Sequence, residues 1–522
     1  MSLLTMGACS KDFLDSEEVT TGTEENFYKT PGDGFRALVG CYDGLQQVYD
    51  NGIAFPLVSE VMSDNVFGGG GNGDGLGFQM MDEFDKLRSP ADNDMFGGNW
   101  AAYYRAIFRC NILINKMDQI NWGTNSGLRN TYEAEARFIR AYLYFDMVRL
   151  WENIPLLTAP SRENIPQANP DDVYKVIAGD LKFAVDNLPA TAYTAQAAAT
   201  YGRVTKWAAE ALAARVYLYY TGYYSKPDLV GVITKSEALG YLENIISNGG
   251  FGLVDNFANL WPASGSSYVG ENNKETVFAI KYTYTSDYNG NTDGNHWLVM
   301  NGIRTQWLPP YGLGWGASTV SPKLWNAYSN TDSRKVASII SIVDEGVKFT
   351  NQKDQREYTG YYTKKYTPLA IDSAGNAISV VNGKGVGSFQ ISQFQDYVAI
   401  RYSDVLLMAA ELGSPNAQSY LDQVRQRAYK SNFVSVPVSQ SNIMAERRFE
   451  FAFEGIRYWD LLRQGINVAA ATIAESTTVQ NGGVNTTKTI SASKVIETKG
   501  LVQIPYSQIN LSNGVLKQNA GW

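Results

Sequence analysis

The chain has 522 residues, of which 44% are hydrophobic and 18% are charged, so it can bury a large core and is neither disordered nor fibrous. A net charge of −8 and the lack of a long basic run argue against nucleic acid as a partner. Three cysteines are too few for a disulfide framework. The chain has 33 tyrosines and 11 tryptophans, whose rings carry a polar O–H or N–H group. Core packing alone does not require so many of them.

The first residues are typical of a lipid-attachment segment. Cys9 follows the short apolar run LLTMGA, which resembles the end of a bacterial lipoprotein signal, and we expect Cys9 to be the lipidated residue. Residues 1–20 are therefore interpreted as a truncated lipoprotein signal and a polar tether. No apolar run reaches the roughly 18 residues of a transmembrane helix, so membrane attachment is expected through lipid alone.

The part of the chain up to residue 250 is predicted to be mainly helical. Apolar residues recur at helical spacing in three long segments, 35–49, 99–119 and 128–150. A further helix is predicted to begin at Pro170, because Asn169 can cap it and proline suits the first helical position.

Two features of this region stand out from the helical pattern. The segment FGGGGNGDGLG at 67–77 is predicted to be a functional or mobile loop, and it lacks the Lys and Ser/Thr of a phosphate-binding loop. Cys41 and Cys110 lie within apolar helical segments, so both are expected to be buried thiols.

Paired helices recur further along the chain. Segments 205–222 and 236–250 resemble the first and second helices of a tetratricopeptide unit, and 402–428 resembles another such pair. The repeat is degenerate, without one constant period. We predict about four helix pairs stacked in a short superhelix.

The pattern changes after residue 255. TVFAIKYTYT at 276–285 alternates as a strand does, while Gly, Asn, Tyr and Trp crowd residues 284–316, where loops are expected. The predicted fold is mainly α, a tetratricopeptide-like helical-pair superhelix with an irregular, loop-rich C-terminal part containing short strands. We predict a single unit over 21–522, made of a helical scaffold (21–250 and 400–465), a loop-rich ligand-binding part (about 255–400) and a C-terminal tail (466–522).

Several blocks of sequence resemble the SusD/RagB family, in the expected order and over nearly the whole chain. They are CSKDFLD (9–15), EARFIRAYLYFDMVRLWENIPL (135–156), GRVTKWAAEALAARVYLY (202–219), SPKLWNAYSNTDSRK (321–335), IRYSDVLLMAAE (400–411), ERRFEFAFEGIRYWDLLRQG (446–465) and LVQIPYSQI with LKQNAGW (501–522). The shortened signal segment is the one departure from the family pattern.

The resemblance implies a cell-surface outer-membrane lipoprotein that binds oligosaccharides or polysaccharide fragments. It implies delivery of the ligand to a TonB-dependent SusC-like transporter as partner, on which such proteins sit as a lid, and no catalytic role. Much of the ligand site is expected in the irregular part of the fold.

An alternative function comes from paired carboxylates. Glu446, Glu450 and Glu454 are spaced by four on one helix face, and paired carboxylates are the acid and base of glycoside hydrolases. A structural ion-pair network is the preferred interpretation, because several arginines are close in sequence: Arg447, Arg448, Arg457 and Arg463. The single histidine, His296, makes a charge-relay triad unexpected and excludes multi-histidine metal sites.

The aromatic residues of the loops are the better candidates for ligand contacts. Sugar rings pack their C–H faces on indole and phenol rings, while amides and carboxylates bond the hydroxyl groups. Loop tryptophans are favoured for this role, whereas Trp100, Trp207, Trp325 and Trp459 are expected to pack in helices. The predicted ligand-binding residues are Trp315, Trp297, Tyr288, Asn291, Asp293, Tyr311, Asn65 and Phe67, with Trp307 and Phe78 in the same two segments.

Two further points stay open at this level. A tetratricopeptide-like superhelix also suits a protein-only adaptor with a peptide groove. No cofactor is expected, although loop Asp and Asn oxygens are compatible with a structural calcium ion at a position that the sequence does not locate.

Overall fold

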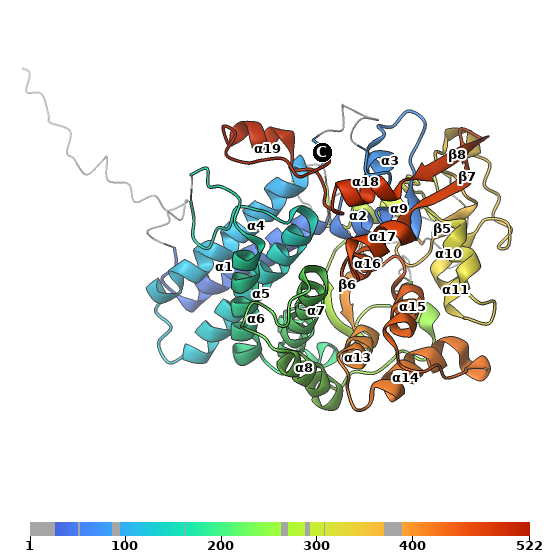
Figure 1. Cartoon of the computed structure of the whole chain (residues 1–522). Coiled ribbons are helices and arrows are strands. Elements are labelled where there is room, and N and C mark those ends of the chain that lie inside the picture. Colours follow the sequence, from blue (N-terminus) through green and yellow to red (C-terminus); the bar gives the residue numbers. More distant parts are fainter. Residues whose placement is uncertain are drawn as a thin grey trace, which may run out of the picture.

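The structure, a computed structural model, describes residues 27–50, 53–85, 94–161, 163–262, 270–287, 293–306, 308, 310–369 and 389–522. Cys9, Tyr288, Asn291 and Trp307 lie outside these residues. Helices dominate the described part, and strands are short (Figure 1). The longer helices of the scaffold are α1 (Pro31–Tyr49), α4 (Gly97–Lys116), α5 (Ser126–Trp151), α6 (Pro170–Asn187), α7 (Lys206–Tyr224), α8 (Lys235–Asn248), α13 (Tyr402–Glu411) and α14 (Ala417–Tyr429).

These helices pack as a succession of four pairs. The helices α1 and α4 pack together, as do α5 and α6, α7 and α8, and α13 and α14, and each pair contacts the next. Figure 1 shows the succession running from α1 and α4 along one side to α13 and α14 at the bottom. The predicted helical-pair scaffold is confirmed.

Local capping explains where several of these helices begin. The Thr30 backbone N–H donates to the Asp33 carboxylate at 2.7 Å, and the Asp33 N–H donates back to the Thr30 hydroxyl, which is a capping box at the start of α1. Asn169 accepts from the Asp171 N–H at 2.9 Å, with Pro170 in the first position of α6, as predicted.

The rest of the fold consists of short elements that cover one side of the scaffold. The strands form antiparallel pairs: β1 (Val66–Gly68) with β3 (Ser318–Val320), β2 (Thr276–Ile280) with β6 (Tyr397–Arg401), β4 (Ile339–Ser341) with β5 (Tyr361–Thr363), and β7 (Glu475–Asn481) with β8 (Val484–Ile490). The helices outside the four pairs are α2 (Phe55–Val61), α3 (Gly77–Asp82), α9 (Trp297–Asn301), α10 (Pro322–Ala327), α11 (Arg334–Ser338), α15 (Gln440–Phe451), α16 (Arg457–Leu462), α17 (Ile466–Ile473), α18 (Ala492–Glu497) and α19 (Tyr506–Leu511). The expected strand at 276–285 is thus present but ends at Ile280.

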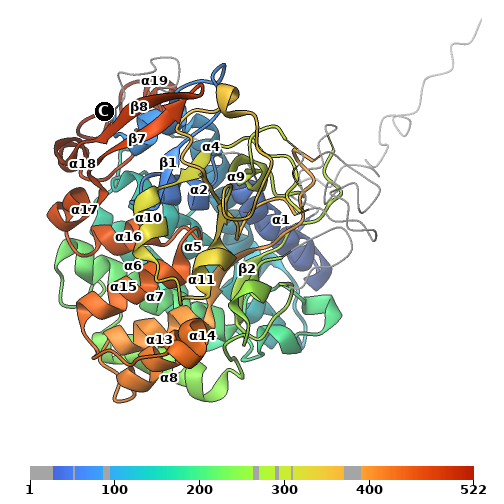
Figure 2. The same ribbon diagram turned by 90° about the vertical axis from the view of Figure 1, so that its right-hand side faces the viewer.

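The C-terminal tail holds more regular structure than its sequence indicates. Strands β7 and β8 form a hairpin of seven residues on each side, which Figure 2 shows at the upper edge of the molecule. Threonine and other polar residues fill most positions, and Val479, Lys488 and Ile490 are the buried ones. Because the apolar face is so short, the alternation of hydrophobic residues that marks a strand is nearly absent.

One continuous hydrophobic core joins the helical pairs to this covering layer. Cys41 and Cys110 belong to it and are both fully buried, as predicted. Among the described helices, none is both long enough and apolar enough to span a membrane.

Candidate functional site

The glutamates Glu450 and Glu454 lie in a buried ion-pair network. The helix α15 ends at Phe451, so Glu454 follows it in a turn, and the prediction that all three glutamates share one helix face is wrong for Glu454. Glu450 is fully buried and accepts from Arg334 at 3.1 Å, from Arg401 at 2.9 Å and also from Arg427. Burial would raise the pKa of Glu450, but Arg427, Arg401 and Arg334 outweigh burial and hold the pKa far below its ordinary value. Glu454 accepts from Arg401 at 2.8 Å and from a buried lysine, Lys365. The ion-pair network that the charges of this segment predict is therefore present at Glu450 and Glu454.

The cations of the network are not the ones that are nearest in sequence. Arg448 and Arg457 both pair with Asp64 at 2.8 Å, and Arg447 pairs with Asp460 at 2.7 Å. Arg463 pairs with Asp460 and Glu411. The local cluster of charges therefore divides into separate ion pairs that join α15 and α16 to different parts of the chain.

Several predicted ligand residues are covered by protein. Trp297 was expected on an exposed loop, which is wrong: it begins α9, is 1% exposed, and packs its ring 5.1 Å from that of Tyr366. Tyr311 is also 1% exposed, and its hydroxyl donates to Glu345. Ring packing explains the position of Trp297, whereas Tyr311 also has a polar partner for its hydroxyl.

Asn65 and Phe67 are buried for a different reason. Phe67 lies in β1 and pairs with Thr319 of β3, while the Asn65 side chain donates to Glu60 at 3.3 Å. Strand pairing at this point replaces the exposed loop that the glycine-rich sequence predicts. Asp293 is half-buried and lies apart from these residues, beside Lys281 in a separate groove.

A groove of about 540 Å³ lies where the two loop segments of the prediction meet. The β1–β3 pair brings these segments together, since β1 leads into the glycine-rich loop and β3 follows Trp315. The side chains that decide its character are Phe78, Met300 and Trp315, which are apolar, and Asp74, Arg304 and Thr305, which are polar. Trp315 and Phe78 are thus the predicted residues that the structure places in one groove together with part of the glycine-rich loop.

The groove is held in shape by arginines behind the loop. Arg304 pairs with Asp74 at 3.1 Å and with Asp354 at 3.2 Å, and it also donates to the Trp315 carbonyl at 3.2 Å. Arg356 donates to backbone carbonyls of the loop, including that of Asp74 at 2.7 Å. These contacts therefore hold the glycine-rich loop against the other side of the groove.

Sequence reasoning missed the polar residues of this groove. Arg304 and Asp74 lie inside the two predicted segments, but neither belongs to an aromatic pattern. Met300 is on α9, which the composition of residues 284–316 does not predict. The signal that could have pointed to Arg304 is its position in the chain between Trp297 and Trp307.

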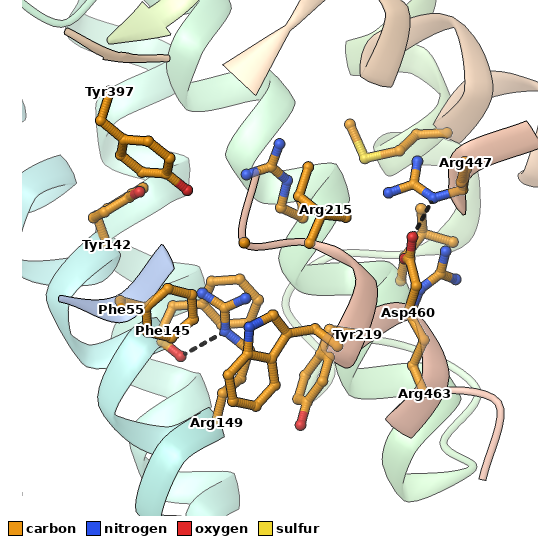
Figure 3. A pocket seen from close by; sticks show the side chains of 15 residues that line it. Phe55, Tyr142, Phe145, Arg149, Arg215, Tyr219, Tyr397, Arg447, Asp460 and Arg463 are labelled. Atoms are coloured by element: carbon orange, nitrogen blue, oxygen red, sulfur yellow. Dashed lines mark hydrogen bonds and ion pairs between the residues drawn. The ribbon is translucent and has the colours of Figure 1, made fainter. Parts of the chain in front are cut away.

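A second cavity lies between the helical pairs and the covering layer, lined by residues of α5 and α7 on one side and of α2 and α16 on the other, and is shown in Figure 3. The Arg149 guanidinium lies 3.8 Å from the ring centre of Phe145 and 4.5 Å from that of Phe55, and it pairs with Asp146 at 2.6 Å. The cavity holds about 30 Å³, which is room for one or two water molecules and too small for a sugar ring. It is a packing feature of the core.

No group of three or more His, Cys, Asp and Glu side chains in the described ranges is arranged to hold an ion. Burial lowers the pKa of His296, whose ring packs edge-on against Trp315 at 5.5 Å. His296 thus supports one side of the groove as a neutral ring.

A helical-pair scaffold that carries an aromatic groove, with its acidic cluster taken up in ion pairs, defines a mainly helical protein of the SusD-like type. Two family models match the chain: one described as the SusD family over residues 274–522, and one described as "Starch-binding associating with outer membrane" over residues 77–218. The chain belongs to the SusD family.

Known relatives match most of the chain at low identity. SusD-like protein P2 of Formosa agariphila is 26% identical over 483 residues, which are 88% of each chain. Surface glycan-binding protein A of Bacteroides thetaiotaomicron, solved in complex with laminarihexaose, matches with a TM-score of 0.75 and 25% identity, covering 95% of this chain and 100% of that chain. A laminarin binding SusD-like protein matches with a TM-score of 0.73 and 26% identity at the same coverage.

Proposed function

We propose that this protein binds oligosaccharides in the groove lined by Trp315 and does not cleave them. The observation that carries the proposal is the meeting of a half-buried indole with Phe78 and Asp74 in one groove of sugar-binding size. An indole face stacks on a sugar ring, and a carboxylate accepts hydrogen bonds from sugar hydroxyls. The two structural relatives described above are named for binding laminarin or its hexasaccharide, which supports this choice of ligand.

The charges in the groove favour a neutral oligosaccharide. Among the described lining residues, Arg304 is the cation, and its guanidinium is already compensated by Asp74 and Asp354. The Asp74 side chain is 52% exposed and adds negative charge at the rim. A uronate or sulfate group would meet this carboxylate without a free cation from the described lining, so it would be repelled.

We further propose that the protein is anchored through lipid on Cys9 at the cell surface and passes its ligand to a SusC-like transporter in the outer membrane. The family model that matches residues 77–218 is described as associating with the outer membrane, which supports this location. Replacing Cys9 by serine should release the protein from the outer-membrane fraction of cells. Retention of the Cys9→Ser variant in that fraction would contradict the anchor.

Isothermal titration with oligosaccharides tests the binding proposal. Laminarihexaose and maltohexaose serve as neutral ligands and an alginate hexasaccharide as the anionic one. Trp315→Ala should weaken the neutral complex by roughly 10- to 100-fold, since it removes the stacking face. Trp325, which is half-buried against Tyr361 outside the groove, is the matched control, and Trp325→Ala should leave affinity unchanged.

The same samples separate the alternatives. Release of reducing sugar that disappears in a Glu450→Gln protein whose circular dichroism shows it to be folded would favour the hydrolase. The absence of binding across a broad glycan array would favour the adaptor. Unchanged affinity in a folded Trp315→Ala protein would contradict the groove as the site, and tighter binding of the alginate fragment would contradict its preference for neutral sugars.

A further inference from the structure

The helices α1 and α4 pack antiparallel at very close range. The Arg109 guanidinium on α4 donates to the Gly40 carbonyl on α1 at 3.0 Å. A Cβ placed on Gly44 would lie 3.0 Å from the Cα of Ala106. Since contacts further along α1 meet residues earlier on α4, the two helices run in opposite directions, side by side as Figure 1 shows. Glycine facing alanine is what lets the two backbones approach so closely.

This register sets two thiols opposite one another. Cys41 lies one turn before Gly44 on α1, and Cys110 lies one turn after Ala106 on α4. Both cysteines are fully buried in the interface between the helices. The Cys110 thiol, and next to it burial, raise the pKa of the Cys41 thiol well above its ordinary value, as contact between two buried thiols does.

The close approach meets the geometric need of a disulfide. A disulfide requires Cα atoms about 4.4–6.8 Å apart, which helices packed at the usual distance of about 8–10 Å between axes reach with difficulty. The Gly44–Ala106 contact shortens that distance within one turn of Cys41 and Cys110. Few other changes in the chain would then be needed for the two sulfur atoms to bond.

We propose that Cys41 and Cys110 form a disulfide that joins α1 to α4 when the chain folds in an oxidising compartment outside the cytoplasm. The compartment follows from the location in the proposed function, whereas the geometry does not depend on it. A disulfide-bearing oxidant, such as a thiol oxidoreductase or oxidised glutathione, is the electron acceptor. The Cys41 thiolate attacks the oxidant and releases one of its thiols, and the Cys110 thiolate then attacks the Cys41 sulfur and releases the second. Two electrons pass to the oxidant, and the two protons lost by Cys41 and Cys110 end on the two thiols that it releases.

The order of events follows from burial. In the folded protein both thiols are shielded from an oxidant, and a raised pKa keeps Cys41 protonated and unreactive. Oxidation therefore precedes the final packing of α1 on α4. The resulting covalent loop, residues 41–110, includes the whole glycine-rich segment of the candidate groove.

Refolding in a glutathione redox buffer tests the proposal. The full chain carries Cys9→Ser so that only these two thiols remain. After refolding, the protein is denatured without reductant, alkylated with iodoacetamide and digested. The expected result is one linked peptide pair containing Cys41 and Cys110, a mass lower by two hydrogen atoms, and no alkylated cysteine. Recovery of both cysteines in alkylated form would overturn the proposal.

Thermal unfolding gives a second readout. Closing a loop of this length constrains the unfolded chain, and reduction should lower the unfolding midpoint by about 4 °C. The Cys41→Ala/Cys110→Ala variant, in which no disulfide can form, should show no difference between oxidised and reduced samples. An equal shift in that variant would also overturn the proposal. Neither readout uses a glycan or a membrane, so failure here leaves the glycan-binding proposal untouched, and failure of glycan binding leaves the disulfide untouched.

Discussion

Replacement of Glu450 by glutamine should strongly destabilise the protein without touching the proposed binding site. The substitution keeps the shape of the side chain but removes the negative charge that Arg334, Arg401 and Arg427 share in a fully buried position. Breaking a buried ion pair by removing one partner costs about 3–5 kcal/mol, because the remaining charges lose compensation. We therefore expect the free energy of unfolding to fall by about 4 kcal/mol at pH 7.

The sign of the pH dependence follows from the depressed pKa of Glu450. A carboxylate with a lowered folded pKa stabilises the fold above its ordinary value of 4.5, and this contribution is lost as the pH falls below it. The difference between the wild-type protein and Glu450→Gln should thus be complete at neutral pH and shrink in acid.

Urea unfolding followed by circular dichroism at pH 7 and at about pH 3.5 measures both effects. Glu497 on α18 is exposed, and Glu497→Gln is the control with an expected change below about 0.5 kcal/mol. A Glu450→Gln protein as stable as the wild type at pH 7 would refute a structural role for the network.

Three further predictions use other parts of the structure. Gly71→Ala should weaken glycan binding by roughly tenfold in titration calorimetry, because its Cβ would displace the Arg304 guanidinium that lines the groove. Gly73→Ala is the control with open space around its Cβ, and it should bind normally. Trp297→Ala should lower the free energy of unfolding by about 3–5 kcal/mol in the same urea assay, because it leaves a cavity where the buried indole was. A variant with weaker glycan binding but unchanged stability would contradict the burial of Trp297. Burial raises the pKa of Glu60 from 4.5 to about 7, so stability from this group is full below pH 4.5 and is lost by roughly 3 kcal/mol as the pH rises through 7. Glu60→Gln should remove that part of the pH dependence, and an unchanged slope between pH 5 and pH 8 would contradict it.

The local sequence pattern was sufficient to predict the helices of the scaffold. Helical spacing of apolar residues, with Asn169 and Pro170 at a helix start, predicts elements that each depend on residues within a few turns. The burial of Cys41 and Cys110 follows from the same periodicity. These properties are encoded over short distances, so a single sequence is enough to infer them.

Composition predicted exposed loops at two positions where contacts with distant parts of the chain bury the side chains. Trp297 lies in a stretch of loop-like composition, yet it is buried against Tyr366, which is far along the chain. Phe67 is covered because β1 pairs with β3, more than 200 residues later. No pattern within either segment records its partner.

The motif ERRFEFAFEGIRYWDLLRQG shows both sides of this division. By itself, the sequence determined the family resemblance and the helix that carries Glu446 and Glu450, whereas it did not show that this helix ends before Glu454. Only the tertiary structure decided which cations neutralise them, and brought Trp315 and Asp74 into one groove. Helix formation depends on neighbours in the chain, whereas charge pairing and groove formation depend on strands and helices that meet only after folding.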